Sequence, residues 1–155
     1  MKGNDRVIEK LNDLLSDELT AINQYFIHAE MCDNWGYEKL HDKIRERSIT
    51  EMKHAEKLIE RIIFLDGRPI VSNYKTISIG GDVPGQFQND WKAEEIAIKG
   101  YNEGIRVAAE EGDNGTRELL ASILKEEEEH IDWIESQKDQ IQQMGLPNYL
   151  VEQID

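Results

Sequence analysis

The sequence predicts an all-α protein: an antiparallel four-helix bundle with one long crossover and a short C-terminal fifth helix. Apolar residues recur every three or four positions through four long stretches, as on the buried face of an amphipathic helix. Glycine and proline interrupt that pattern between the stretches. The first and last connections are short, and the middle one is long. We expect residues 1–155 to form a single domain.

The first two helices are predicted from their terminating signals. The first is expected from about Asp5 to Asn34, where Gly36 follows. The second is expected from about Tyr37 to Asp66, ahead of Gly67-Arg68-Pro69. The polar, glycine-containing segment 67–82 then forms the long connection.

The second half of the chain repeats this arrangement. The third helix is expected to start after Asp82, with Pro84 tolerated in its first turn, and to end near Gly112. Thr116 is the predicted N-cap of the fourth helix, which continues to Met144. The tail beyond it forms the fifth helix. Two helical hairpins joined by a crossover therefore make the bundle.

Charge and composition exclude several classes of protein. Acidic residues outnumber basic ones by 32 to 18, giving a net charge of −14. Without a basic stripe, nucleic acid is not an expected partner, whereas cations are favoured. The longest apolar run, Ile62–Leu65, is too short for a membrane span, and the start lacks the apolar core of a signal peptide. Cys32 is the one cysteine, so we expect an inert packed thiol and a cytoplasmic location.

Each of the four long helices carries a glutamate in the middle of its apolar stripe. Two helices add a histidine three residues later, on nearly the same face. These six residues are Glu18, Glu51, His54, Glu94, Glu127 and His130. A shift of 76 residues carries the first-half members onto the second-half ones, and also carries Tyr25 onto Tyr101. The two hairpins therefore resemble pseudo-symmetric copies whose ligands meet at mid-bundle.

Four ionised carboxylates in an apolar core would cost several kcal/mol each if they were unpaired. We expect no lysine or arginine at the same level of these stripes. Two divalent cations would balance the four negative charges, and neutral imidazoles would complete the coordination. Such ligands suit iron or manganese, and zinc is a further option. A single glutamate in a stripe is usually a snorkelling residue, but six ligand-type residues in register predict a two-metal centre.

The sequence resembles bacterioferritin over essentially its whole length, and specific motifs carry the resemblance. They are Met1-Lys2-Gly3, the stretch from Glu18 to Phe26, the stretch from Glu51 to Ala55, Glu127 with the stretch from His130 to Trp133, and Met144-Gly145-Leu146 with Asn148-Tyr149-Leu150. The resemblance implies a ferritin-like bundle in a hollow homo-oligomeric cage of 24 subunits, built from two-fold dimers.

The implied function is iron storage and detoxification. Fe(II) would be oxidised by dioxygen or peroxide at a ferroxidase centre, and Fe(III) would collect as mineral in the cage. By resemblance Glu18 and Glu94 are terminal ligands, Glu51 and Glu127 bridges, and His54 and His130 terminal nitrogens of two irons ~3.5–4 Å apart. Tyr25 would be redox-active or hydrogen-bonded beside them, or simply packed. A ferredoxin-type reductant is the implied partner for iron release.

Met52 follows Glu51 directly, so it points about 100° away from the centre, toward the outside of the bundle. An outward apolar patch is expected around it, formed by Leu19, Phe26, Ile49 and Ile59. This patch suggests a two-fold subunit interface. The resemblance implies a b-type haem there, shared between two subunits, with Met52 of each as an axial ligand that raises the haem potential.

One feature of the family is less complete in this chain, and a second is matched only by residue type. Its inner-surface iron site, a His and an Asp, corresponds to Glu46 and Thr50, so that site is in doubt. Whether the di-iron centre is a fixed cofactor or a gate therefore stays open. Residues resembling the lining of a pore for iron are Asn34, Asp66, Asp132 and Asn148, each of which also suits a solvated helix end.

Rival functions remain at this point. A rubrerythrin-like di-iron peroxidase or oxidase uses a similar ligand set. Its rubredoxin-like module needs paired Cys-x-x-Cys motifs, however, and this chain has a single cysteine. A non-catalytic metal-buffering cage subunit is the other alternative. A DNA-protecting mini-ferritin is disfavoured, because its site is shared between subunits. The sequence leaves open the preferred oxidant, the porphyrin, its occupancy and co-assembly with a second subunit.

Overall fold

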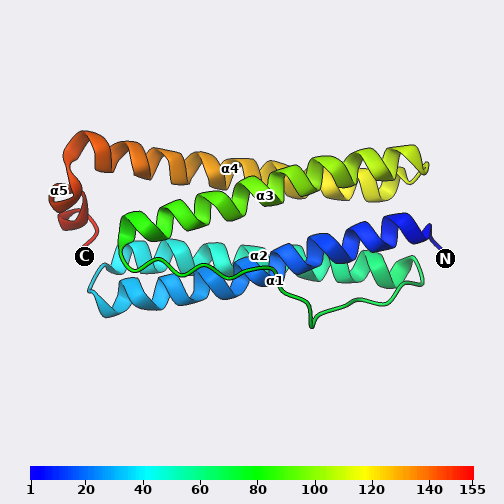
Figure 1. Cartoon of the computed structure of the whole chain (residues 1–155), viewed down its shortest axis with the longest axis horizontal. Coiled ribbons are helices and arrows are strands. Elements are labelled where there is room, and N and C mark those ends of the chain that lie inside the picture. The colour runs from blue at the N-terminus through cyan, green and yellow to red at the C-terminus, as the bar shows by residue number, and fades with distance from the viewer.

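The computed structural model describes residues 1–155 and contains five helices and no strand (Figure 1). The helices are α1 (Asp5–Asn34), α2 (Glu38–Phe64), α3 (Val83–Glu110), α4 (Asn114–Met144) and α5 (Leu146–Val151). The predicted all-α class, with its four-helix bundle and short fifth helix, is confirmed. No helix combines the length and the apolar composition that a membrane span requires.

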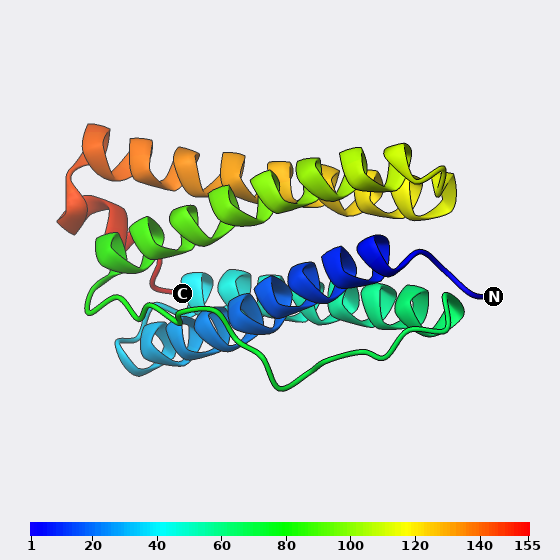
Figure 2. The same ribbon diagram turned by 45° about the vertical axis from the view of Figure 1, so that its right-hand side comes forward.

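The bundle consists of two stacked hairpins, α1 with α2 and α3 with α4 (Figure 2). Gly36 and Gly112 end the first helix of each hairpin, and both have positive φ, +85° and +70°. Glycine adopts this left-handed conformation without steric cost, so the chain can turn directly into the next helix. Because the same 76-residue shift relates Gly36 to Gly112, the internal repeat extends to the turns.

The crossover between the hairpins has no regular secondary structure and runs alongside α1 (Figures 1 and 2). Polar side chains on one face of α1 hold it in place. The acceptors are Thr20, Gln24 and His28, and the donors are the backbone N–H groups of Lys75, Ser78 and Gly80, at 2.7–3.0 Å. Buried Asp90 of α3 accepts in turn from the Gln24 amide at 2.8 Å. The segment without helix is therefore fixed by side-chain hydrogen bonds.

Two apolar clusters fill the bundle on either side of its middle. One contains Leu11, Leu58 and Tyr101, and the other contains Tyr25 and Tyr149. The hydroxyl of Tyr149 on α5 donates to Gln137 Oε1 at 2.6 Å, which attaches the short helix to α4. Between these clusters lies the level of the four glutamates.

Two predicted boundaries are wrong in detail. The N-cap of α4 is Asp113, whose carboxylate accepts from the Thr116 backbone N–H at 3.0 Å, so Thr116 lies inside the first turn. Its hydroxyl donates to Asp113 at 2.6 Å and accepts from Arg61 at 2.9 Å. Helix α2 ends at Phe64, before Asp66, which has a φ of 58°. A residue in that left-handed conformation cannot continue a right-handed helix.

Candidate metal centre

The six predicted ligands meet in the middle of the bundle, and the side chains are 0–8% exposed. They form two groups of possible metal ligands, Glu18, Glu51, His54 and Glu127 in one, and Glu51, Glu94 and His130 in the other. Within each group the ligand atoms lie within 4.8 Å of one another. Glu51 belongs to both groups. The arrangement therefore offers two adjacent cation positions that share a carboxylate.

Both histidines turn Nδ1 toward the carboxylates. Nδ1 of His54 lies 2.9 Å from Glu127 Oε1 and 3.3 Å from Glu51 Oε2. Nδ1 of His130 lies 2.8 Å from Glu94 Oε1. On the other side of its ring, Nε2 of His54 contacts the carboxylate of Glu126. A carboxylate in that position fixes the orientation of the imidazole and makes it a better metal ligand.

Two tyrosines orient the carboxylates of the opposite hairpin. The hydroxyl of Tyr25 on α1 donates to Glu94 Oε1 on α3 at 2.5 Å. The hydroxyl of Tyr101 on α3 donates to Glu18 Oε1 on α1, also at 2.5 Å. Burial, together with the charge of the partner glutamate, raises the pKa of each phenol well above its usual value, so both remain donors. Tyr101 had no predicted role at the site, although the 76-residue shift from Tyr25 pointed to it.

Arg47 contradicts the expectation that no lysine or arginine lies at the level of the four glutamates. Its guanidinium Nη2 is 2.7 Å from Glu51 Oε1 and 3.4 Å from Glu127 Oε2. The side chain is only 13% exposed. It lies one helical turn before Glu51 and is long enough to reach the centre from there. One guanidinium still leaves most of the charge of four glutamates uncompensated.

The remaining charge appears as carboxylate oxygens that accept no hydrogen bond and as shifted pKa values. Five buried carboxylate oxygens have no hydrogen-bond donor: Glu18 Oε2, Glu51 Oε1, Glu94 Oε2 and both oxygens of Glu127. Burial raises the pKa of Glu18 and of Glu127 well above the usual range. Burial alone would lower the pKa of His54, but contacts with Glu18 and Glu51 raise it to about 10. Divalent cations would bind these lone pairs and displace the protons, so the residues fit a metal pair.

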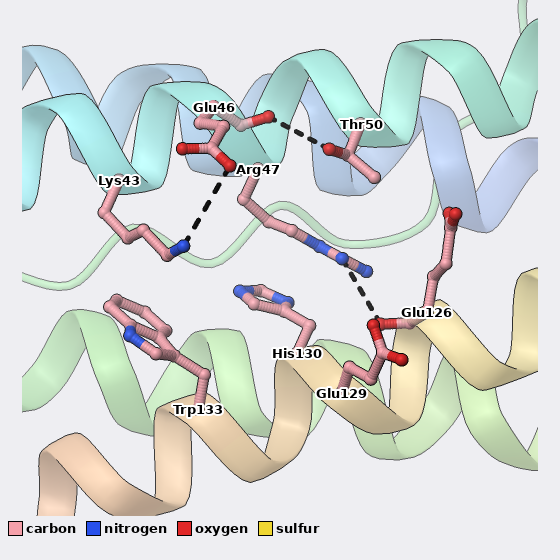
Figure 3. A pocket seen from close by; sticks show the side chains of 8 residues that line it. All are labelled: Lys43, Glu46, Arg47, Thr50, Glu126, Glu129, His130 and Trp133. Atoms are coloured by element: carbon pink, nitrogen blue, oxygen red, sulfur yellow. Dashed lines mark hydrogen bonds and ion pairs between the residues drawn. The ribbon is translucent and has the colours of Figure 1, made fainter.

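A pocket of about 420 Å³ lies between α2 and α4 and reaches this centre at His130 (Figure 3). Its lining is mostly charged: Lys43, Glu46, Arg47, Thr50, Glu126, Glu129, His130 and Trp133. The Thr50 hydroxyl donates to the backbone oxygen of Glu46 at 3.2 Å, and the Glu46 carboxylate is 4.0 Å from the Lys43 ammonium. Ring centroids of His130 and Trp133 are 6.0 Å apart in a stacked arrangement.

Comparisons with known proteins agree with this fold. The ferritin-like domain family matches residues 8–144. A bacterioferritin of Brucella melitensis is 42% identical, covering 96% of this chain and 92% of the relative. A bacterial ferritin of Synechocystis sp. is 41% identical, covering 99% of both. A bacterioferritin of Streptomyces coelicolor is 42% identical, covering 97% of this chain and 90% of the relative.

The chain belongs to the bacterioferritin family.

The residues expected at a bacterioferritin dimer interface lie on the outside of the bundle. Met52 is 50% exposed and Phe26 45%, whereas Leu19, Ile49 and Ile59 are partly buried. Met52 is thus half-exposed on the outside of the bundle, whereas Glu51 next to it is buried.

The four residues predicted to line a pore do not meet within one chain. Asn34 ends α1, and Asn148 lies on α5 near the same end of the bundle (Figure 1). Asp66 lies at the opposite end, where its carboxylate is 3.5 Å from the N-terminal amine. Asp132 is exposed on α4. Any pore that uses all four therefore needs several subunits.

Cys32 lies in the core, and its thiol donates to Gln86 Oε1 at 3.3 Å. Burial raises the pKa of this thiol to about 12. A thiol that does not ionise is a poor nucleophile, which agrees with the predicted packing role.

Proposed function

We propose that this protein stores iron by oxidising Fe(II) at the six-residue centre, with dioxygen or peroxide as oxidant. Ferric mineral then collects inside a cage of 24 copies. The observation that carries the proposal is the cluster of four buried glutamates beside two imidazoles, in which five carboxylate oxygens accept no hydrogen bond. Family membership supports iron storage.

The protein residues would act as a preformed Fe(II) binding site. Four carboxylates balance the charge of two Fe(II) ions, with Glu51 placed between the two positions. The hydroxyls of Tyr25 and Tyr101 hold one oxygen of Glu94 and of Glu18, leaving the other free for iron. Two Fe(II) ions supply the two electrons that reduce dioxygen to hydrogen peroxide, or hydrogen peroxide to water, with uptake of two protons.

Stopped-flow absorbance on metal-free, assembled protein tests this function. After anaerobic loading with Fe(II), mixing with oxidant is expected to give a fast phase that saturates near two irons per chain. Glu18→Ala combined with His130→Ala removes a ligand from each position, so the fast phase is expected to disappear while the cage still assembles. Glu128→Ala is the control, because it removes an exposed carboxylate next to Glu127.

Each outcome has a defined meaning. A fast phase in the double variant would rule out the assigned ligands. Slow, unsaturable oxidation by the unmodified protein would favour a non-catalytic metal-buffering cage. Recovery of the fast phase in a second round would indicate a gate that passes iron inward, whereas its loss would indicate a pair of irons that stays bound.

We also propose a haem site at a two-fold interface. Met52 of each subunit would hold the haem iron, and the apolar residues that would contact the porphyrin are Leu19, Phe26, Ile49 and Ile59. A half-exposed methionine on the outside of the bundle fits such a group. When bound, haem would supply electron transfer, from a ferredoxin-type reductant to the ferric mineral during release.

A further inference from the structure

Arg47 occupies an unusual place for an arginine, because it reaches into the cluster of carboxylates that the proposed function assigns to iron. Its Nη2 lies 2.7 Å from Glu51 Oε1, an oxygen with no hydrogen-bond donor. It is also 3.4 Å from Glu127 Oε2, which likewise lacks one. The guanidinium therefore lies where cations are most favoured, and it approaches the same oxygens that a metal would use.

The contacts of this guanidinium are ion pairs and not a saturated hydrogen-bond network. Nε and Nη2 of Arg47 are buried without an aligned acceptor. Only Nη1 donates, to the backbone oxygen of Glu126 at 3.3 Å. Arg47 thus compensates charge without the fork-like pairing that fixes an arginine on one carboxylate. Another cation can therefore replace the guanidinium at these carboxylates.

With both metals bound, the charge balance reverses. Two divalent cations match the four glutamates, so a guanidinium at the same carboxylates becomes surplus positive charge. The pocket between α2 and α4 offers an alternative position, since Arg47 already lines it together with Glu126 and Glu129 (Figure 3).

We propose that Arg47 is an internal counter-cation of the empty centre, which leaves Glu51 and Glu127 for the pocket when divalent cations bind. This role rests on the proposed function only in its assignment of the metal ligands. Arg47 competes with metal at the shared carboxylate, so it weakens metal affinity and stabilises the metal-free fold. Arg47 acts on metal binding through Glu51 and Glu127 and does not itself bind the metal.

Equilibrium titration of metal-free protein with Co(II) tests the proposal. Co(II) is used because it binds without being oxidised during the titration. Arg47→Gln removes the charge and is expected to bind Co(II) about tenfold more tightly. It is also expected to lower the melting temperature of the metal-free protein, with the loss shrinking when Co(II) is saturating. Arg47→Lys should restore much of the competition. Arg45→Gln is the matched control, because it removes the same charge from an exposed position on the same helix.

The results separate this inference from the proposed function. Unchanged or weaker Co(II) affinity in Arg47→Gln would overturn the counter-cation role, as would an equal loss of melting temperature with and without Co(II). A Co(II)-loaded crystal structure with Arg47 still on Glu51 would do the same. Failure of rapid Fe(II) oxidation would leave these results intact, whereas absence of Co(II) binding by the unmodified protein would remove the metal centre itself.

Discussion

Glu18 and Glu94 each have one oxygen held by a tyrosine and one oxygen without a donor. The tyrosine comes from the other hairpin in both cases, so the two halves of the bundle orient each other's ligands. A hydrogen bond to one oxygen fixes the carboxylate plane and directs the second oxygen into the centre. Ligand geometry at the residue scale therefore depends on correct docking of the hairpins.

The Tyr101→Phe variant tests this orientation. Loss of the hydroxyl leaves Glu18 Oε1 without its donor, and loss of such a partner typically weakens metal binding by about 10- to 100-fold. We expect a decrease in Co(II) affinity in that range, measured by titration. Tyr149→Phe is the control, since this buried tyrosine donates to Gln137 away from the centre. Equal affinity in the two variants would contradict an orienting role.

The stability of the metal-free protein should fall as the pH rises between the ordinary pKa of histidine, 6.5, and the raised pKa of His54, about 10. The pKa of His54 is about 10, against an ordinary 6.5. The folded state therefore keeps a proton that the unfolded state loses, and stability present below pH 6.5 is lost as the pH approaches 10. Glu18 and Glu127 also have raised pKa values, so their contribution to stability is likewise lost as the pH rises. That loss begins at a lower pH than the loss from His54.

Melting temperatures of metal-free protein across this pH interval measure the effect. His54→Gln should flatten the alkaline decline, whereas His41→Gln, outside the centre, should keep it. Metal binding displaces the same protons, so Co(II) affinity is expected to rise with pH. A metal-free melting temperature that does not change across the interval would contradict a protonated His54.

The sequence predicted the cluster of six ligand-type residues but not its surroundings, for a physical reason. Glutamate in an apolar stripe is costly, so Glu18 and its counterparts are conspicuous in the pattern. Arg47 precedes Glu51 by one turn, but a side chain of that length can reach either solvent or the centre. Tyr101 fits a stripe equally well as packing. Only the positions of neighbouring helices decide between these alternatives.

At the scale of elements, the internal repeat explains why helix limits could be predicted closely. Both hairpins end their first helix at a glycine with positive φ, and such a signal is visible in sequence. The start of α4 was harder, because Asp113 and Thr116 are both good capping residues three positions apart. Arg61 of α2 does not distinguish them, since it donates to Asp113 at 2.8 Å and to Thr116 at 2.9 Å. The Thr116 backbone N–H donates to the Asp113 carboxylate, which identifies Asp113 as the cap.

Removing this cap should weaken the junction between α2 and α4. Asp113→Ala loses the acceptor for the Thr116 N–H and the partner of Arg61, so we expect a destabilisation of about 1–2 kcal/mol. Denaturant unfolding of the metal-free protein measures it. Asp113→Asn keeps a capping acceptor and should cost less. If Thr116→Val alone reproduced the full loss while Asp113→Ala had no effect, the predicted Thr116 cap would be correct after all.

At the scale of the whole molecule, the two proposed sites differ in what one chain supplies. All six proposed ligands of the metal centre come from a single chain. By contrast, Met52 provides one thioether on the outside, and Asn34 and Asp66 lie at opposite ends of the bundle. The proposed oxidation chemistry would therefore need the residues of one subunit, whereas the proposed haem site and any pore would require assembly.

The Met52→Leu variant tests this dependence on assembly. Leucine retains the apolar surface but cannot bind haem iron, so we expect an assembled cage without haem, measured by absorbance and size-exclusion chromatography. Met52→His should bind haem with an altered spectrum, because imidazole replaces the thioether. Met144→Leu is the control, as Met144 is 40% exposed elsewhere on the surface. Full haem loading of Met52→Leu would refute the ligand, and rapid Fe(II) oxidation should persist in all three variants because the metal centre lies within each chain.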